Sequence, residues 1–306
     1  MKSQRGVAAV TAILIVAVAA AAATVMLSQQ SAMLDQVSMV TARAQADAYA
    51  QAGIDWARGV LAAHVGSVDS LDEPWAQPIA ALPVERAVVS GALVDEQGKM
   101  DLNNLATGGG ESPQALAFRR LLAQLGLPPD LADPVRDWVD ADQEPSPAGA
   151  EDAYYLSLPR PYRAANQPMT QVEELYRVRG FDAATVGKLL PYVTALPHVL
   201  ANDAKTAINV NTAPAAVIAA ALDVPPGKVA GLVAARRKKA FASKQAFLDA
   251  AVAAGAKNPV EALFDVRSAF FTVRIAVAQD DVRLASDALL QRTGNAVAVA
   301  WRRPRY

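Results

Sequence analysis

The chain begins with a long apolar stretch. Residues 7–27 carry no charged side chain, whereas Lys2 and Arg5 precede them and the first acid is Asp35. These 21 residues are about the number that an α-helix needs to cross a bilayer. The basic residues on the N-terminal side predict that this end faces the cytoplasm and that the rest lies across the membrane. A cleaved secretory signal peptide is the alternative, but its apolar region has only about 7–15 residues.

The helical pattern continues beyond the apolar stretch. No proline occurs before Pro74, and apolar side chains recur every three or four residues, a spacing typical of an amphipathic helix. The side chains of this stripe are Met33, Val37, Val40, Ala44, Ala48, Ile54, Ala57 and Leu61. We therefore predict one helix from residue 7 to about 64, roughly 87 Å long at about 1.5 Å per residue. Such a helix suits a subunit that packs among similar helices.

Alternating polar and apolar positions predict β-strands toward the other end of the chain. The alternation is clearest at residues 271–275, and short polar turns separate three runs. The predicted C-terminal strands are residues 269–278, 282–292 and 296–302. Earlier in the chain, residues 88–95 and 100–102 read as a hairpin around the turn at 96–99.

Helix signals fill the region between these strands. Ser112 and Pro113 are typical of a helix start, Leu122 belongs to its apolar face, and Gly126 is typical of its end. Two later segments resemble each other weakly, and each reads as helix, turn, helix. The two segments are residues 170–191 and 212–235. They are similar to sterile-alpha-motif or helix-hairpin-helix folds.

The order of these elements predicts an α+β protein in which a helical insert divides an antiparallel sheet. The predicted organisation is a leader at 1–6, a transmembrane and spine helix at 7–66, the first part of a β domain at 67–105, an inserted helical domain at 106–264 and completing strands at 265–306.

Composition excludes several classes of protein. The chain has 306 residues, 53% of them hydrophobic, and a formal net charge of −1, so it is neither disordered nor strongly attracted to nucleic acid. It has no cysteine, which excludes disulfides and thiolate metal sites. Its only histidines are His64 and His198, which leaves almost no material for a Ser-His-Asp triad. We predict a protein that is not an enzyme.

One acidic loop has the spacing of a calcium site. Residues 140–151 place acids at positions 1, 3, 5 and 12, as in the loop by which an EF-hand surrounds calcium with oxygen atoms. The acids at these positions are Asp140, Asp142, Glu144 and Glu151. Crowded carboxylates repel one another unless a cation neutralises them, and we therefore predict calcium binding.

This acidic loop departs from an EF-hand in two ways. Pro145 stands where the sharp turn needs glycine, and the flanking helices do not have the EF-hand arrangement. We therefore predict an irregular calcium loop rather than a calcium sensor, with Asp137 and Asp152 as second-choice ligands. The alternative is a solvated acidic loop in which Asp140 or Asp142 caps a helix.

A basic run after the second helical segment favours a different function. Residues 236–239 are all Arg or Lys, and helix-hairpin-helix modules bind duplex phosphates with backbone amides and nearby cations. A membrane-anchored, competence-type DNA receptor is therefore the runner-up. Pro225 and Pro226 argue against it, because proline has no amide hydrogen to donate to phosphate. We expect no nucleic acid partner.

The first residues carry a resemblance to a known family. Residues 1–6, which are short, basic and end in Gly6, resemble a class III prepilin leader. Such leaders are cut by prepilin peptidase, here between Gly6 and Val7, and methylation of the new N-terminus follows. Most pilins and pseudopilins have Glu at the fifth mature position, whereas this chain has Thr11. That departure resembles the large minor pseudopilin K of type II secretion systems.

Further motifs extend this resemblance over nearly the whole chain. They lie at residues 98–103, 137–142, 149–155 and 208–214. The resemblance implies a pseudopilin sheet with a helical insert, calcium binding and no catalysis. It also implies a single-pass inner-membrane subunit with a periplasmic body. Its expected partners are the I and J minor pseudopilins of a tip complex and the major pseudopilin filament, and its expected role is to cap that filament and support protein export across the outer membrane.

Overall fold

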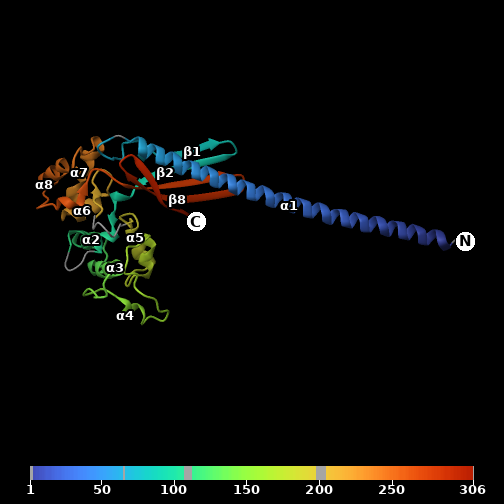
Figure 1. The fold of residues 1–306 in the computed structure, drawn as a ribbon, viewed down its shortest axis with the longest axis horizontal. Helices are drawn as coiled ribbons and strands as arrows, with labels where there is room; N and C mark the ends of the chain where they lie inside the picture. The colour runs from blue at the N-terminus through green and yellow to red at the C-terminus, as the bar shows by residue number, and fades with distance from the viewer. Residues whose placement is uncertain (1–2, 65, 107–111, 198–204, 306) are drawn as a thin grey trace.

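A computed structural model describes residues 3–64, 66–106, 112–197 and 205–305. Its dominant element is α1 (Ser3–Ala63), a single helix of 61 residues and therefore about 90 Å long. Figure 1 shows that α1 runs along the body with its C-terminal part and extends far beyond it toward the N-terminus. Residues 9–41 of this helix are exposed. Among the described residues, α1 is the one helix long and apolar enough to cross a membrane.

The C-terminal part of α1 packs against a β-sheet through small and branched side chains. The buried positions are spaced four, four, three and four residues apart, so they form one face of the helix. They are Ala46, Ala50, Ile54, Ala57 and Leu61. Alanines on this face let the helix approach the sheet closely. At Gly53 the approach is so close that an added Cβ would lie 2.3 Å from Cδ1 of Ile275 in the sheet.

The sheet has five antiparallel strands in the order β1-β2-β7-β8-β9. The strands are β1 (Ile79–Val84), β2 (Ala87–Asp95), β7 (Phe270–Gln279), β8 (Val282–Thr293) and β9 (Ala296–Pro304). The three predicted C-terminal strands are confirmed. The contact between β2 and β7 joins residues from both sides of the helical region, with Asp95 opposite Phe271. The α+β class, the long helix and the antiparallel sheet are therefore confirmed.

The predicted hairpin of residues 88–102 is wrong. β2 pairs instead with β1, which the sequence did not predict. After a 3-10 turn at η2 (Glu96–Gly98), β3 (Met100–Asp101) pairs in parallel with β4 (Val193–Thr194). Residues 100–105 consequently pack in the core of the helical region rather than in the sheet.

The helical region holds the remaining helices, and Figure 1 shows it at the end of the body opposite the N-terminus. Its α-helices are α2 (Pro113–Gln124), α3 (Ala132–Val139), α4 (Asp152–Tyr155), α5 (Ala183–Leu189), α6 (Ala215–Leu222), α7 (Pro226–Lys238) and α8 (Lys244–Ala253). Ser112 caps α2 and accepts from the amide of Ala115, and Gly126 follows its end with a positive φ of 67°, as the sequence predicts.

Short elements complete the helical region. They are the 3-10 helices η3 (Leu102–Leu105), η4 (Pro129–Leu131), η5 (Val172–Arg177) and η6 (Glu261–Leu263), and the strands β5 (Ile208–Asn209) and β6 (Phe264–Asp265), which pair in parallel. A further 3-10 helix, η1 (Pro74–Ala76), precedes β1, and its Trp75 packs in the core between α1 and the sheet. The second predicted helical segment forms α6 and α7. The first forms η5 and α5, so its opening half is a 3-10 rather than an α-helix.

Candidate metal centre

The acidic loop is held by the two helices that flank it. α3 ends at Val139, the backbone of Asp140 turns to an extended conformation, and α4 begins after Glu151. The loop between them folds back because Ser146, through both its amide and its hydroxyl, donates to the carboxylate of Asp137 on α3. This contact brings the far end of the loop back to its start.

A glycine makes this return possible. A Cβ at Gly149 would lie 1.8 Å from Oδ2 of Asp137, so no larger residue fits here without displacing that carboxylate. Asp137 is itself fully buried. The backbone around Gly149 therefore lies directly against Asp137, and the next residues carry Glu151 to the start of the loop.

Three of the four predicted ligands converge. Asp140, Asp142 and Glu151 each offer a carboxylate oxygen, and these oxygens lie within 4.8 Å of one another. Glu151 is 4% exposed, and neither of its carboxylate oxygens has a hydrogen-bond partner. Oδ1 of Asp140 is also buried without a partner. Buried carboxylates without donors are costly, and a bound cation would remove that cost.

The raised pKa values of Glu151, Asp140 and Asp137 reflect the same burial and crowding of carboxylates. Burial, together with the charges of Asp137 and Asp140, raises the pKa of Glu151 to about 7. Burial, with the charges of Asp142 and Asp137, raises the pKa of Asp140 to about 6. Burial also raises the pKa of Asp137, although its hydrogen bonds to Ser146 oppose the shift. In the absence of a cation this loop therefore favours protonated acids.

The other predicted ligands lie outside this group. Glu144 is exposed, and its amide donates to Oδ1 of Asp142 (2.9 Å). Asp152 pairs with Arg163 (3.1 Å) and accepts from the amide of Ala164. The carboxylate of Asp137 accepts hydrogen bonds from Ser146. The structure thus brings together Asp140, Asp142 and Glu151 and assigns other contacts to the remaining acids.

Asn166 is a neighbour of this group that spacing along the loop did not reveal. Its Nδ2 donates to the carbonyl oxygen of Asp142 (2.6 Å), and its side chain acts to lower the pKa of Glu151. Its Oδ1 is buried without a partner. Carboxylate and amide oxygens are the ligands that calcium prefers. The donor atoms present therefore fit a hard divalent cation.

One of the four cations in the basic run is buried and serves the fold. Arg236 is 8% exposed, and its Nη1 donates to the carbonyl oxygen of Val210 (2.5 Å), so this guanidinium supports the fold. Pro225 is the N-cap residue of α7 and Pro226 is its first residue, at the helix end where phosphate binding needs amide donors. Three exposed cations remain at the end of α7, and they suit the negative end of the helix dipole.

Comparison with known proteins identifies the family. Two family profiles, both described as type II secretion system (T2SS) protein K, match residues 98–198 and 208–267. The type II secretion system protein K of Pseudomonas aeruginosa is 34% identical, over 95% of this chain and 90% of the relative. That of Pectobacterium carotovorum is 31% identical, over 98% of this chain and 96% of the relative. The chain belongs to the type II secretion system protein K family.

The predicted resemblance to the protein K family is thereby confirmed. The fold is also similar to a chain in the crystal structure of the GspK-GspI-GspJ complex from the enterotoxigenic Escherichia coli type 2 secretion system. The TM-score is 0.74 at 22% identity, over 86% of this chain and 96% of that chain. As a member of the protein K family, the chain is a minor pseudopilin with an N-terminal transmembrane helix that anchors it to a membrane.

The residues predicted for processing and assembly all lie in α1. Gly6 and Val7 are within the helix, and Thr11 lies on its exposed part. Cleavage and methylation at this site stay predictions. His198, one of the two histidines, lies outside the described residues.

Proposed function

We propose that this protein K family member is a non-catalytic subunit that caps the tip of the type II secretion pseudopilus and supports protein export across the outer membrane. The observation that carries the proposal is the shape in Figure 1: a thin helix ends in a body whose large helical region lies beyond the sheet. Copies that stack through α1 along a shaft would have to fit this body between neighbours. At the tip it has no neighbour ahead.

The fifth mature position supports the same placement. In the pseudopilins that this chain resembles, an acid there pairs with the N-terminal ammonium of a neighbouring subunit, and a buried charge needs such a partner. Thr11 carries no charge with which to pair. This lack has no consequence for a subunit with nothing ahead of it.

We propose that the I and J minor pseudopilins are its partners, since the structure with the similar fold contains chains of that description. The subunit would then start the filament of major pseudopilins. Co-purification with the other minor pseudopilins tests the complex. Gold labels on the helical region, viewed on isolated filaments by electron microscopy, test the position. Labels at one end are expected, whereas labels spaced along the shaft contradict the tip placement.

We further propose that the chain is anchored in the inner membrane with its N-terminus in the cytoplasm and its body in the periplasm. The basic residues before the apolar segment support this orientation. Processing by prepilin peptidase would leave Val7 as the first residue. N-terminal sequencing of the membrane-extracted protein checks this. A start near residues 28–32 would indicate ordinary signal-peptide cleavage instead.

Finally, we propose that Asp140, Asp142 and Glu151 bind calcium, with Asn166 beside them. The ion would neutralise the converging carboxylates and fasten the loop between α3 and α4. A ligand that binds only the folded state adds about 2.7 kcal/mol of stability at one hundred times its dissociation constant. Unfolding of the full chain with calcium and in metal-free buffer should therefore differ clearly, and identical unfolding curves would count against the site.

A further inference from the structure

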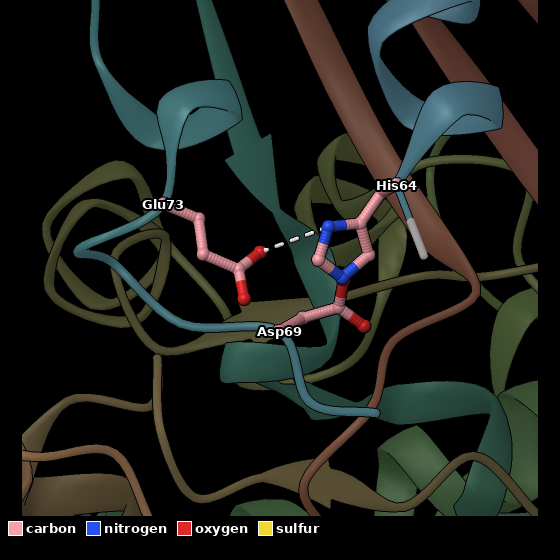
Figure 2. Close-up of side chains that lie close together, drawn as sticks. All are labelled: His64, Asp69 and Glu73. Carbon is pink, nitrogen blue, oxygen red and sulfur yellow. Dashed lines mark ion pairs between the residues drawn. The ribbon is translucent and has the colours of Figure 1, made fainter. Parts of the chain in front are cut away.

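A second cluster of metal-ligating side chains lies far from the acidic loop, where α1 ends. His64 directly follows the last residue of α1, and the next segment of chain carries Asp69 and Glu73. Figure 2 shows the imidazole of His64 between the two carboxylates. Each of the three offers one donor atom, and these atoms lie within 4.8 Å of one another. The function proposed above uses none of these residues.

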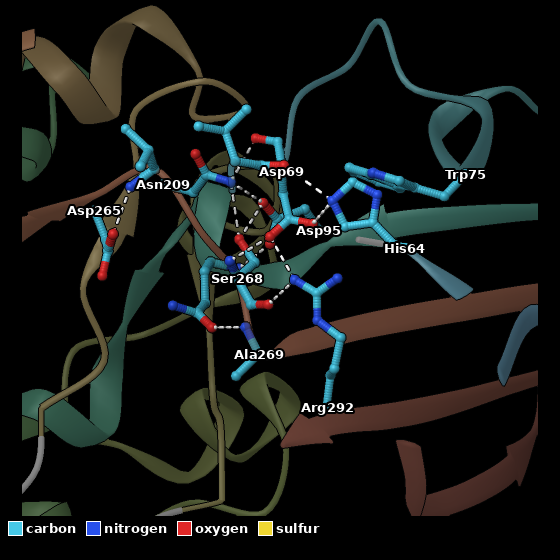
Figure 3. Close-up of polar contacts among 12 residues, drawn as sticks. His64, Asp69, Trp75, Asp95, Asn209, Asp265, Ser268, Ala269 and Arg292 are labelled. Carbon is cyan, nitrogen blue, oxygen red and sulfur yellow. Dashed lines mark hydrogen bonds and ion pairs between the residues drawn. The ribbon is translucent and has the colours of Figure 1, made fainter. Parts of the chain in front are cut away.

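The two carboxylate oxygens of Asp69 differ, because Oδ2 accepts hydrogen bonds and Oδ1 accepts none. It is fully buried, and its Oδ2 accepts from the guanidinium of Arg292 and from the amide of Ser268 (2.8 Å). Its Oδ1 has no hydrogen-bond partner and lies 3.6 Å from Nε2 of His64. Figure 3 shows this carboxylate between the buried network and the imidazole. A fully buried oxygen without a donor thus points into the cluster.

The tautomer of His64 follows from a backbone contact. Nε2 lies 3.0 Å from the carbonyl oxygen of Val68, and a carbonyl can only accept, so Nε2 carries the hydrogen. In the neutral ring, Nδ1 then presents a lone pair toward Oε2 of Glu73 at 3.5 Å. Histidines that bind metals commonly donate their other ring N–H to a backbone carbonyl in this way.

The separation of Nδ1 and Glu73 fits the edge of a coordination tetrahedron. Two acceptors facing each other repel unless a cation lies between them. With zinc–nitrogen and zinc–oxygen bonds of about 2.0–2.1 Å, neighbouring tetrahedral ligands lie about 3.4 Å apart. The observed 3.5 Å is close to this value and longer than the usual hydrogen bond of about 2.7–3.2 Å. The donor atom of Asp69 lies within 4.8 Å of those of His64 and Glu73. To complete the set it must come closer to Nδ1, because its Oδ1 now lies beside Nε2, and this needs rotation of the half-buried side chains of His64 and Glu73.

The local charges also favour a cation. Asp69 and Glu73 bring two carboxylates, and the guanidinium of Arg292 pairs with Asp69 on its Oδ2 side. Asp95 adds a third buried acid to the same network, where it accepts from Asn209 (3.0 Å). The negative end of the α1 dipole points at the cluster as well.

We propose that His64, Asp69 and Glu73 bind a divalent transition metal ion, of which zinc fits best, and that this ion fastens the end of α1 to the body. An imidazole nitrogen with two carboxylates suits zinc rather than calcium, which takes oxygen ligands alone. The ion would join the helix to the segment that contacts β8 through Arg292 and the helical region through Asn209, whose Nδ2 donates to the carbonyl oxygen of Asp69 (3.0 Å). The protein thus carries two metal sites of different chemistry.

Cobalt(II) is the probe for this site, because it substitutes for zinc and its visible absorption reports nitrogen and oxygen ligands in a tetrahedral arrangement. The full chain, prepared in detergent without a histidine tag, is titrated with cobalt and then with zinc. We expect one equivalent of cobalt per chain, a visible band that zinc abolishes, and a higher melting temperature with zinc. Absence of the band overturns the proposal.

Two variants keep the local hydrogen bonds while removing a ligand. His64→Gln retains a donor for Val68, and Glu73→Gln retains an acceptor for the indole of Trp75, which now donates to Glu73 (2.6 Å). Each should weaken cobalt binding at least tenfold. His198→Gln, which changes the chain's other histidine, is the matched control and should bind cobalt normally. Equal binding by His64→Gln and the control overturns the proposal.

Two further outcomes are decisive. Asp142→Asn should abolish the calcium effect and leave cobalt binding unchanged; loss of cobalt binding in this variant would show that the ion occupies the acidic loop instead. In the zinc-loaded chain, a nitrogen-15 spectrum should show the hydrogen on Nε2 and the metal on Nδ1. A hydrogen that stays on Nδ1 when zinc is added would mean that this nitrogen binds no metal, and the proposal would be wrong.

Discussion

Replacing Glu151 by glutamine should change stability in opposite directions with and without calcium. Glu151 is 4% exposed, and both its carboxylate oxygens lack a donor. Burial and the neighbouring charges of Asp137 and Asp140 raise its pKa from 4.5 to about 7. Folding at pH 8 in metal-free buffer therefore forces an ionised group into unfavourable surroundings. Glutamine has nearly the same shape and no charge, so Glu151→Gln removes this cost.

The sign and size of the effect follow from linkage. An acid whose pKa is raised by folding contributes stability that is full below its ordinary value of 4.5 and is lost as the pH rises through about 7. At about 1.4 kcal/mol per pKa unit the upper bound is about 3 kcal/mol. Solvent at the exposed Asp142 screens part of the repulsion, so we take about 1–2 kcal/mol. Glu151→Gln should be more stable than wild type by that amount at pH 8 without calcium.

With calcium the order should reverse. Wild type gains about 2.7 kcal/mol at one hundred times the dissociation constant, whereas Glu151→Gln loses most of that gain. Urea unfolding of the full chain in detergent measures both states. The fluorescence of Trp138 reports the helical region, because this side chain is 3% exposed and lies against Tyr155 with ring centroids 5.3 Å apart.

Asp152→Asn is the matched control for this experiment. Asp152 is next to Glu151 in the chain but pairs with Arg163, so its change should lower stability equally with and without calcium. If Glu151→Gln instead destabilises the metal-free protein at pH 8, then Glu151 makes a favourable contact there and the argument from repulsion is refuted.

Three further substitutions test the packing of the body, each by urea unfolding. Gly149→Ala should destabilise the helical region by a few kcal/mol and abolish calcium binding, since its Cβ would lie 1.8 Å from Asp137; Gly187→Ala, which meets nothing within 4 Å, should be neutral or slightly stabilising. Gly53→Ala should lower the free energy of unfolding by about 1–3 kcal/mol. Adding Ile275→Val to that variant should restore most of the loss, because it removes Cδ1, the atom 2.3 Å from the new Cβ. If the effects of the two substitutions simply add, this explanation is contradicted. Asn103→Ala should lower the free energy of unfolding by about 2–4 kcal/mol. Its Nδ2 donates to the carbonyl oxygens of Met169 (2.9 Å) and Leu196 (2.8 Å), and its Oδ1 accepts from the amide of Met169 (2.7 Å). A loss below about 0.5 kcal/mol would show that water replaces these hydrogen bonds.

The elements that the sequence predicted correctly are those whose signal is local. The apolar stripe of α1 and the alternation of β7 depend on neighbouring residues alone. β1 was missed because it is an edge strand with mostly exposed side chains and contains Pro83, which an edge strand tolerates. The hairpin at 88–102 was wrong because the partner of Met100 is Val193, far along the chain, and no local pattern indicates that pairing.

The candidate metal sites show the same difference between local signals and contacts that are distant along the chain. The spacing of Asp140, Asp142 and Glu151 identified a group that one loop brings together. Glu144 does not join it, since it precedes Pro145, and a residue before proline is driven toward extended backbone. Asn166 lies outside the loop, so its approach depends on the tertiary fold.

The cluster at the end of α1 had a local signal that was not used. Three acids, Asp69, Asp72 and Glu73, follow one of only two histidines within nine residues. Spacing alone did not indicate a site, because it does not show that Oδ1 of Asp69 is buried without a donor.

The division of the sheet by the helical region has a consequence for the order in which the chain can fold. A ribosome produces α1, β1 and β2 first, but β2 lacks its partner β7 until the whole helical region has been made. During that interval one edge of β2 is open to pairing with other chains, and α1 has no complete sheet to cover. Closing the gap between Asp95 and Phe271 is easier once the intervening residues are compact, because loop closure then costs less entropy. The helical region should therefore fold before the sheet, and a mutation that slows it should appear as aggregation of newly made chains even where the finished protein is stable.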